Sequence, residues 1–271
     1  MQTKRNDKFY SEMVERNIGV LSSGEQNRLR SSCVAVAGCG GMGGVSAEQI
    51  VRLGVGRVKI ADFDNFETHN LSRQACSTTS TLGRNKAEVL GKHLKDINPE
   101  LKLEIFKEGV VPENVEEFLD GSEVTIDGID YNSLHSAVLL ERAARKRNIC
   151  FISPLAIAFG VSVFVFGPGT MSLEEYVGLP PNSPEEKIKK FRTPPEKSAP
   201  YMPSYVNLKK ARVAAALRMN IPNIIMPQHL GGGIAVSEAA MILLGRIKPP
   251  AGPGPRIFVF DIQDRKFEVT E

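Results

Sequence analysis

Apolar and polar positions follow two periods along the chain. Short apolar runs rich in β-branched residues recur between residues 33 and 166, and segments with apolar residues three or four positions apart separate them. The runs predict strands at 33–37, 56–62, 101–106, 123–127, 149–152 and 160–166. The helical spacing predicts helices near 44–53, 86–97, 112–119 and 134–147. Strands that alternate with helices indicate a Rossmann-like, doubly wound α/β fold with a mostly parallel sheet and helices on both faces.

The pattern changes after Gly169. Residues 178–203 include seven prolines mixed with Lys and Glu, which predicts a long mobile loop with at most one short helix, near 185–191. Two helices (208–219 and 233–244) and a closing hairpin (256–261 with 266–269) are expected after it. We therefore divide the chain into a helical extension (1–30), an α/β core (31–169), a Pro-rich mobile loop (170–205) and C-terminal helices with a hairpin packed on the core (206–271).

Composition restricts the class of protein. The chain is 42% hydrophobic and 24% charged, as in ordinary globular domains, and a net charge of +3 gives no indication of nucleic acid as the main partner. The four cysteines form no CxxC pair, so we expect neither a disulfide framework nor zinc, and a reducing cytoplasm fits. The longest apolar run, near 154–166, is shorter than the ~20 residues of a membrane helix, so no membrane association is expected.

A glycine cluster, GCGGMGG at 38–44, follows the first predicted strand and opens the next helix. Glycines let backbone N–H groups approach phosphates, and a helix N-terminus attracts anions. On its own this pattern fits several nucleotides and also tight packing. Between a strand and a helix it indicates nucleotide binding by the core, with Gly38, Gly40, Gly41 and Gly43 in contact with the ligand.

Polar residues follow the second predicted strand. Asp62 ends that strand, where a carboxylate can accept hydrogen bonds from ribose hydroxyls. The loop and helix that follow contribute Asp64, Asn70, Arg73, Gln74 and Lys86. Arg and Lys side chains in such a loop match the charge of a triphosphate. Each of them alone fits a solvated loop equally well, but beside the glycine cluster they favour the triphosphate.

Asp130 lies in DGIDYN (127–132), at the carboxyl end of a predicted strand. That edge is where open α/β sheets bind ligands, and a carboxylate there can hold Mg²⁺ against phosphate oxygens. A cap on the following helix is an equally good interpretation of Asp130.

Together these motifs resemble the ThiF/MoeB/HesA superfamily, which includes ubiquitin-activating enzymes, microcin-type peptide adenylases and tRNA threonylcarbamoyladenosine dehydratases. The resemblance covers about residues 9–169 in full. The matching pieces, in order, are Arg16-Asn17, GCGGMG at 38–43, ADFD at 61–64, NLSRQ at 70–74, Lys86 with INP at 97–99, and DGIDYN at 127–132.

The resemblance implies an adenylyltransferase that uses ATP and Mg²⁺ to activate a carboxylate as an acyl-adenylate with release of pyrophosphate. It assigns the ribose to Asp62, the phosphates to Asn70, Arg73 and Lys86, and Mg²⁺ to Asp130, with Asp64 near the metal and triphosphate. Arg16 is expected to reach the ATP of the other subunit of a homodimer, or else to be a solvated helix residue. The predicted catalytic residues are Arg73, Lys86, Asp130 and Arg16.

The expected acyl substrate is a small protein or peptide with a free carboxylate, such as a ubiquitin-like sulfur carrier or a precursor peptide. Ubiquitin-activating relatives carry a nucleophilic cysteine in the loop after the sheet, whereas this chain has no cysteine after Cys150, so no thioester step is expected. Cys76 lies near Arg73, which could lower the pKa of its thiol and give it a redox or acceptor role.

Three alternatives stay open. One is an activator of a tRNA or small-molecule carboxylate, of the dehydratase type, for which nucleic acid would be a partner. The others are an NAD-dependent oxidoreductase and a nucleotide-sensing dimer without enzymatic activity. Arg73, Lys86 and Asp130 argue against NAD, because a pyrophosphate needs neither a metal nor so many cations.

Overall fold

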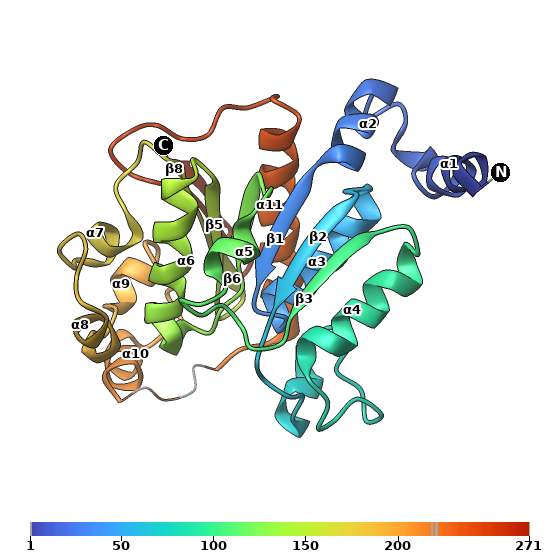
Figure 1. The fold of residues 1–271 in the computed structure, drawn as a ribbon. Helices are drawn as coiled ribbons and strands as arrows, with labels where there is room; N and C mark the ends of the chain where they lie inside the picture. Colours follow the sequence, from blue (N-terminus) through green and yellow to red (C-terminus); the bar gives the residue numbers. More distant parts are fainter. Residues whose placement is uncertain (1, 218, 220–221, 271) are drawn as a thin grey trace.

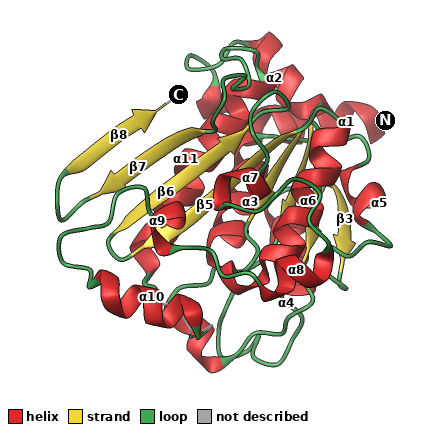
Figure 2. Ribbon diagram, turned by 90° about the vertical axis from the view of Figure 1, so that its left-hand side faces the viewer, coloured by secondary structure: helices red, strands yellow, loops and turns green. Residues whose placement is uncertain are grey.

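One eight-stranded sheet runs through the molecule in the order β3–β2–β1–β4–β5–β6–β7–β8 (Figures 1 and 2). The computed structural model describes residues 2–217, 219 and 222–270. Pairing is parallel from β3 through β5 and antiparallel from β5 through β8, which confirms the predicted Rossmann-like, mostly parallel sheet with a C-terminal hairpin. The strands are β1 (Cys33–Ala37), β2 (Arg57–Ala61), β3 (Lys102–Phe106), β4 (Val124–Asp127), β5 (Cys150–Ile157), β6 (Gly160–Phe166), β7 (Arg256–Asp261) and β8 (Lys266–Thr270).

Helices cover both faces of the sheet because its central strands are apolar on both sides. In β1, Val34 and Val36 pack into one core cluster and Ala35 and Ala37 into the other. The valine side is covered by α3 (Gly41–Leu53), α4 (Lys86–Ile97) and α11 (Ile225–Leu243). The alanine side is covered by α5 (Val115–Leu119), α6 (Leu134–Lys146), α7 (Leu173–Val177) and α8 (Glu185–Lys190).

The C-terminal helix α11 is longer than the sequence predicts. It begins at Ile225, whereas the prediction placed its start at 233 and was wrong. Glycines lower helix propensity, but here they allow close packing on α3: a Cβ on Gly231 would lie 2.7 Å from the Met42 side chain, and one on Gly232 would lie 2.8 Å from Val45. The two helices run side by side, and both begin at the carboxyl edge of the sheet (Figure 1).

The Pro-rich segment is more structured than expected. This segment, residues 178–203, contains both α8 and α9 (Pro195–Ser198), and α7 lies just before it, so the prediction of at most one short helix was wrong. Its base is held to α6: Arg142 forms a bidentate pair with Glu174 and donates to the carbonyl oxygen of Ser183 at 2.8 Å. The predicted mobility of the rest of the segment stays a prediction. A further helix, α10 (Leu208–Ala216), follows it; Arg218, in the predicted helix 208–219, lies outside the described residues.

The N-terminal elements α1 (Gln2–Met13), η1 (Glu15–Asn17) and α2 (Ser23–Ser31) pack at the far end of α3. The hydroxyl of Tyr10 donates to the carbonyl oxygen of Gly54 at 2.7 Å, and Asn17 donates to that of Leu53 at 3.2 Å. These contacts place the N-terminal elements at the amino edge of the parallel strands (Figure 1). Within the described part of the chain, no helix combines the length and apolar character needed to cross a bilayer.

Candidate active site

The glycine loop turns sharply between β1 and α3. Gly38 has φ +84° and lies so close to β4 that a Cβ on it would be 2.2 Å from the carbonyl oxygen of Gly128. A Cβ on Gly43 would lie 1.8 Å from the carbonyl oxygen of Gly38. Among the described residues no side chain caps α3. The first N–H groups of a helix have no intrahelical partner, so the start of α3 can offer them to an anion.

Asp62 holds this loop. Its Oδ2 accepts a hydrogen bond from the Cys39 N–H at 2.7 Å, and its Oδ1 accepts one from the Asp64 N–H at 2.8 Å. Burial raises the pKa of the Asp62 carboxyl. A carboxylate has about four acceptor positions, so Asp62 can still accept from a ribose hydroxyl while it holds the loop.

Lys86 begins α4 and points back to the end of β2. Its Nζ lies 3.0 Å from Asp64 Oδ2, and its backbone N–H donates to the Asp64 carbonyl oxygen at 2.9 Å. The Lys86 side chain is 8% exposed and that of Asp64 52%. A buried cation is thus neutralised by a carboxylate that faces solvent.

The loop between β2 and α4 brings three further predicted residues to this edge. Asn70 is buried in η2 (Thr68–Ser72), and its Oδ1 accepts from the Glu67 N–H at 2.9 Å. Arg73 donates to the His69 carbonyl oxygen at 2.9 Å. The Gln74 amide lies against the glycine loop, with its Nε2 3.3 Å from where a Cβ on Gly40 would be. Its buried Oε1 has no hydrogen-bond partner among the described residues, which a bound ligand would explain.

Asp130 is exposed at the end of β4 and accepts a hydrogen bond from the Asn132 N–H at 2.8 Å. It therefore caps η3 (Tyr131–Ser133), as the alternative interpretation of the sequence had it. This bond uses one lone pair of Oδ1, so the carboxylate can still take a metal ligand position. In the described part of the chain no group of three His, Cys, Asp or Glu side chains lies together, and a divalent ion here would take most of its ligands from phosphate and water.

Arg16 is exposed and does not join the other predicted residues. Its neighbour Asn17 contacts Leu53 at the C-terminal end of α3, whereas the glycine loop lies at the N-terminal end. At 1.5 Å per residue these two ends are roughly 18 Å apart. Arg16 therefore lies far from the glycine loop of its own chain.

The pKa prediction for Cys76 was wrong. Its side chain is half-buried against the core, and burial raises the pKa of the thiol to about 11. A thiol with this pKa is protonated at neutral pH and is a poor nucleophile.

Two groups at this edge were missed at the sequence level. Gln228 of α11 is buried, and its Oε1 lies 2.1 Å from where a Cβ on Gly41 would be; no local pattern indicates this contact between distant segments. Asp127 is buried and accepts from the Ser153 hydroxyl at 2.9 Å and from the Ile129 N–H at 3.1 Å. Burial raises the pKa of Asp127 to about 6. The first Asp of DGID was the signal that could have drawn attention to it.

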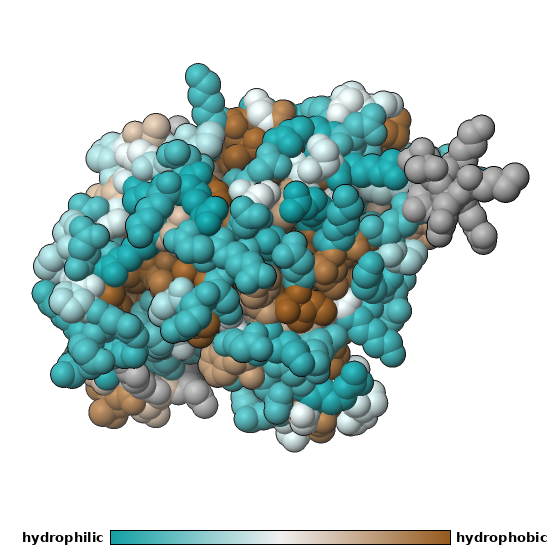
Figure 3. Space-filling model, in the orientation of Figure 1, coloured by the Kyte–Doolittle hydropathy of each residue, from teal (hydrophilic) through white to brown (hydrophobic). Residues whose placement is uncertain are grey.

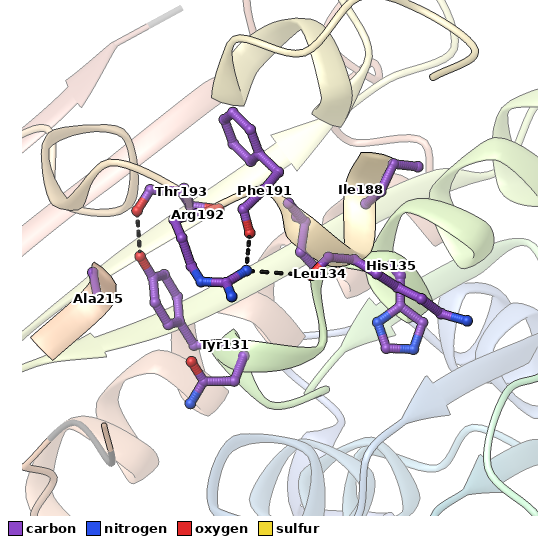
Figure 4. A pocket seen from close by; sticks show the side chains of 10 residues that line it. Tyr131, Leu134, His135, Ile188, Phe191, Arg192, Thr193 and Ala215 are labelled. Atoms are coloured by element: carbon purple, nitrogen blue, oxygen red, sulfur yellow. Dashed lines mark hydrogen bonds between the residues drawn. The ribbon is translucent and has the colours of Figure 1, made fainter. Parts of the chain in front are cut away.

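The Pro-rich segment reaches this edge through Tyr131. The Tyr131 hydroxyl donates to the Thr193 carbonyl oxygen at 2.6 Å, beside a cavity of about 10 Å³ that Arg192 and His135 also line (Figure 4). Thr193, Lys197 and Ser198 also line a second cavity together with Asp130.

Comparison with known proteins finds one family model and several curated relatives. The ThiF family matches residues 14–269. The chain is 35% identical to the tRNA threonylcarbamoyladenosine dehydratase of Bacillus subtilis over 131 residues, which are 48% of this chain and 51% of that protein. It is 33% identical to the sulfur carrier protein adenylyltransferase of Thermus thermophilus over 124 residues, 46% of this chain and 45% of that protein. The chain thus spans about half the length of the curated relatives it matches.

Solved structures share the fold. The crystal structure of PaaA covers 100% of this chain and 82% of its own, with a TM-score of 0.67 and 20% identity. Escherichia coli MccB with ATP covers 91% of this chain and 65% of its own, with a TM-score of 0.65 and 16% identity. From the match over residues 14–269 we conclude that the chain belongs to the ThiF family.

Proposed function

We propose that the protein is an ATP-dependent adenylyltransferase that activates a carboxylate as an acyl-adenylate. The observation that carries the proposal is the meeting, at one edge of the sheet, of the glycine loop, the Asp62 carboxylate that holds it and the buried Lys86. The Thermus relative is named an adenylyltransferase, which supports the same activity here.

The reaction joins two anions. A carboxylate oxygen attacks the α-phosphorus of ATP, a new O–P bond forms, and the bond to the β-phosphate oxygen breaks so that pyrophosphate leaves. The nucleophile is already ionised at neutral pH, so the protein needs no strong base. Its task is to position the two reactants and offset their charge. We assign this task to the N–H groups of α3, Lys86 and Arg73, with Asn70 and Gln74 shaping the pocket.

Mg²⁺ fits the donors at this edge. Asp130 is exposed at the carboxyl end of β4, and Asp64 is half-exposed on the loop after β2; hard carboxylate oxygens are the ligands that Mg²⁺ prefers. We propose that Asp130 holds the ion, which when bound offsets phosphate charge.

The acyl substrate is proposed to be a small protein or peptide with a free carboxylate. A second candidate, a tRNA-borne carboxylate, is favoured by the 35% identity to the Bacillus dehydratase. We further propose a homodimer in which Arg16 serves the ATP of the partner subunit. The exposure of Arg16 and its distance from its own glycine loop support this arrangement.

Pyrophosphate exchange tests the activity. Labelled pyrophosphate should enter ATP only when Mg²⁺ and an accepted carboxylate are present, and Asp130→Ala should abolish exchange while the protein stays folded by circular dichroism. Candidates are small proteins ending in Gly-Gly, precursor peptides and threonylcarbamoyl-modified tRNA. If the protein bound NADH tightly and did not bind Mg-ATP, the oxidoreductase would be supported instead. If it bound ATP but no carboxylate stimulated pyrophosphate exchange, a nucleotide sensor would be supported.

A further inference from the structure

A second cavity adjoins the proposed ATP site, and Asp130 lines it as well. It encloses about 60 Å³ between the sheet, α6, α7 and the Pro-rich segment. On the face drawn in Figure 3, hydrophobic residues form only separate small areas, whereas this cavity, which opens to solvent, gathers apolar side chains around one space. Its lining includes Asp127, Ala137, Ser153, Phe164, Tyr176 and Lys197.

The end of β4 separates this cavity from the glycine loop. Gly128 donates to the Ala37 carbonyl oxygen at 2.6 Å and packs so closely that a Cβ on it would lie 2.8 Å from Gly43 Cα. On the other side, Asp127 and Asp130 line the cavity. A group seated in the cavity could therefore present its carboxylate past Asp130 to a phosphate at the start of α3.

The lining has two kinds of surface. The walls are apolar and aromatic, with Phe164 and Tyr176 in ring contact at 5.3 Å. One polar pair lies among them, the Asp127 carboxyl with the Ser153 hydroxyl. Both residues are more than nine-tenths buried, and their remaining lone pairs can bind a donor on a ligand. Lys197 of the Pro-rich segment lies 5.3 Å from the centre of the Tyr176 ring and adds a cation for an incoming carboxylate.

We propose that this cavity is the acyl subsite, and that it receives the side chain of the residue whose carboxylate is activated. The inference rests on the proposed function. The occupant is compact, because the cavity is well below the ~150 Å³ that accepts benzene. It is largely apolar with room for one hydrogen-bonding atom, as in a terminal threonine, and a terminal valine has the same shape without that atom. A terminal glycine would leave the cavity empty.

Pyrophosphate exchange with the peptides acetyl-Ala-Ala-Gly, acetyl-Ala-Ala-Val and acetyl-Ala-Ala-Thr tests this. The wild type should favour the valine or threonine peptide over the glycine peptide by roughly tenfold or more, the effect of filling an apolar pocket. Ala137→Val narrows the cavity, so it should lower exchange with the valine and threonine peptides and remove that preference. Ser136→Val is the matched control, because Ser136 lies next to it on α6 and does not line the cavity. Equal or better exchange with the glycine peptide in the wild type would overturn the subsite.

Binding without chemistry separates this proposal from the activity itself. In the presence of Mg²⁺ and α,β-methylene-ATP, saturation-transfer NMR should detect 3-methylbutyrate and 3-hydroxybutyrate, which carry the side chains of valine and threonine, on the wild type and on Ser136→Val. The signal should fall several-fold on Ala137→Val, whose melting temperature and nucleotide affinity serve as folding controls. Binding of these acids without exchange would reject the activity and keep the cavity as a carboxylate site. An undiminished signal on Ala137→Val would overturn the subsite, and so would the absence of any signal on the wild type.

Discussion

Lys86 Nζ lies 3.0 Å from Asp64 Oδ2, and the lysine is buried while the aspartate faces solvent. Because Asp64 remains half-exposed, it can turn outward when a phosphate competes for the lysine. Lys86→Ala should therefore weaken binding of Mg-ATP about 10–100-fold, since a charged hydrogen bond is worth about 1.5–3 kcal/mol. Isothermal titration with α,β-methylene-ATP measures the loss. Lys92→Ala, at an exposed position of the same helix, should bind like the wild type; equal losses in both variants would point to a general charge effect.

Gly43 cannot carry a side chain in this loop. A Cβ there would lie 1.8 Å from the Gly38 carbonyl oxygen, so Gly43→Ala must push the loop away from β1. We expect a loss of about 2 kcal/mol or more in the free energy of unfolding and no measurable nucleotide binding. Gly233→Ala is the contrasting change, because a Cβ there meets only Gln49 at 4.0 Å and alanine favours a helix by about 1 kcal/mol. Urea unfolding of both variants checks the pair.

Asp127 makes stability depend on pH. Burial raises its pKa to about 6 in the folded protein, above its value of about 3.9 in an unfolded chain. The folded state therefore binds the proton more tightly, and stability falls as the pH rises from about 4 to about 6. Between pH 7 and pH 5 this carboxyl should give the wild type about 1 kcal/mol of extra stability. Asp127→Asn should lack that gain in urea unfolding at the two pH values, and the same gain in the variant would assign it to other groups.

Several strands and helices could be predicted from the sequence, and others could not. The strands β1, β6 and β7 and the helix α4 begin and end where the periodicity predicts, because their apolar residues face a core on one or both sides. The start of α11 was misplaced because its glycines are explained only by contact with α3. The helix α7 was missed although Ser172 and Glu175 form a capping box, a pattern visible in the sequence.

Site residues that belong to one local motif could be predicted from the sequence, whereas those brought together only by the fold could not. Residues within one local motif, such as Asp62 with the glycine loop, were predicted together and lie together. The Asp127–Ser153 pair was not predicted, because it joins neighbouring strands 26 residues apart. The motif around Arg16 does not indicate where this residue lies relative to the glycine loop. Only the packing of the N-terminal elements shows that Arg16 lies near the C-terminal end of α3.

Mixing two inactive variants tests the role proposed for Arg16. If each site combines Lys86 of one subunit with Arg16 of the other, Arg16→Ala and Lys86→Ala should each lose pyrophosphate exchange. An equal mixture that exchanges subunits should recover about a quarter of wild-type activity, because half of the dimers are mixed and each has one intact site. No recovery in mixed dimers isolated by two affinity tags would place Arg16 outside the partner's site.

Limited proteolysis tests movement of the Pro-rich segment. Trypsin cleavage after Lys187, Lys189 and Arg192 should slow when Mg-ATP and an accepted carboxylate are added, and unchanged cleavage would exclude closure. Arg142→Met leaves buried Glu174 without its bidentate partner, which should loosen the base of the segment and speed cleavage about tenfold. Arg147→Met is the control, because Arg147 is near the same helix end but pairs with Glu116.

The close fit between α3 and α11 has a consequence for how this chain can be divided. Gly231 and Gly232 admit the side chains of Met42 and Val45, so α3, the helix that follows the glycine loop, is covered by α11. A fragment ending after β6 would expose that apolar surface to water and lose Gln228 beside Gly41. We therefore expect that the parallel half of the sheet, residues 31–166, does not fold as a separate domain, because α3 depends on α11 for its apolar contacts.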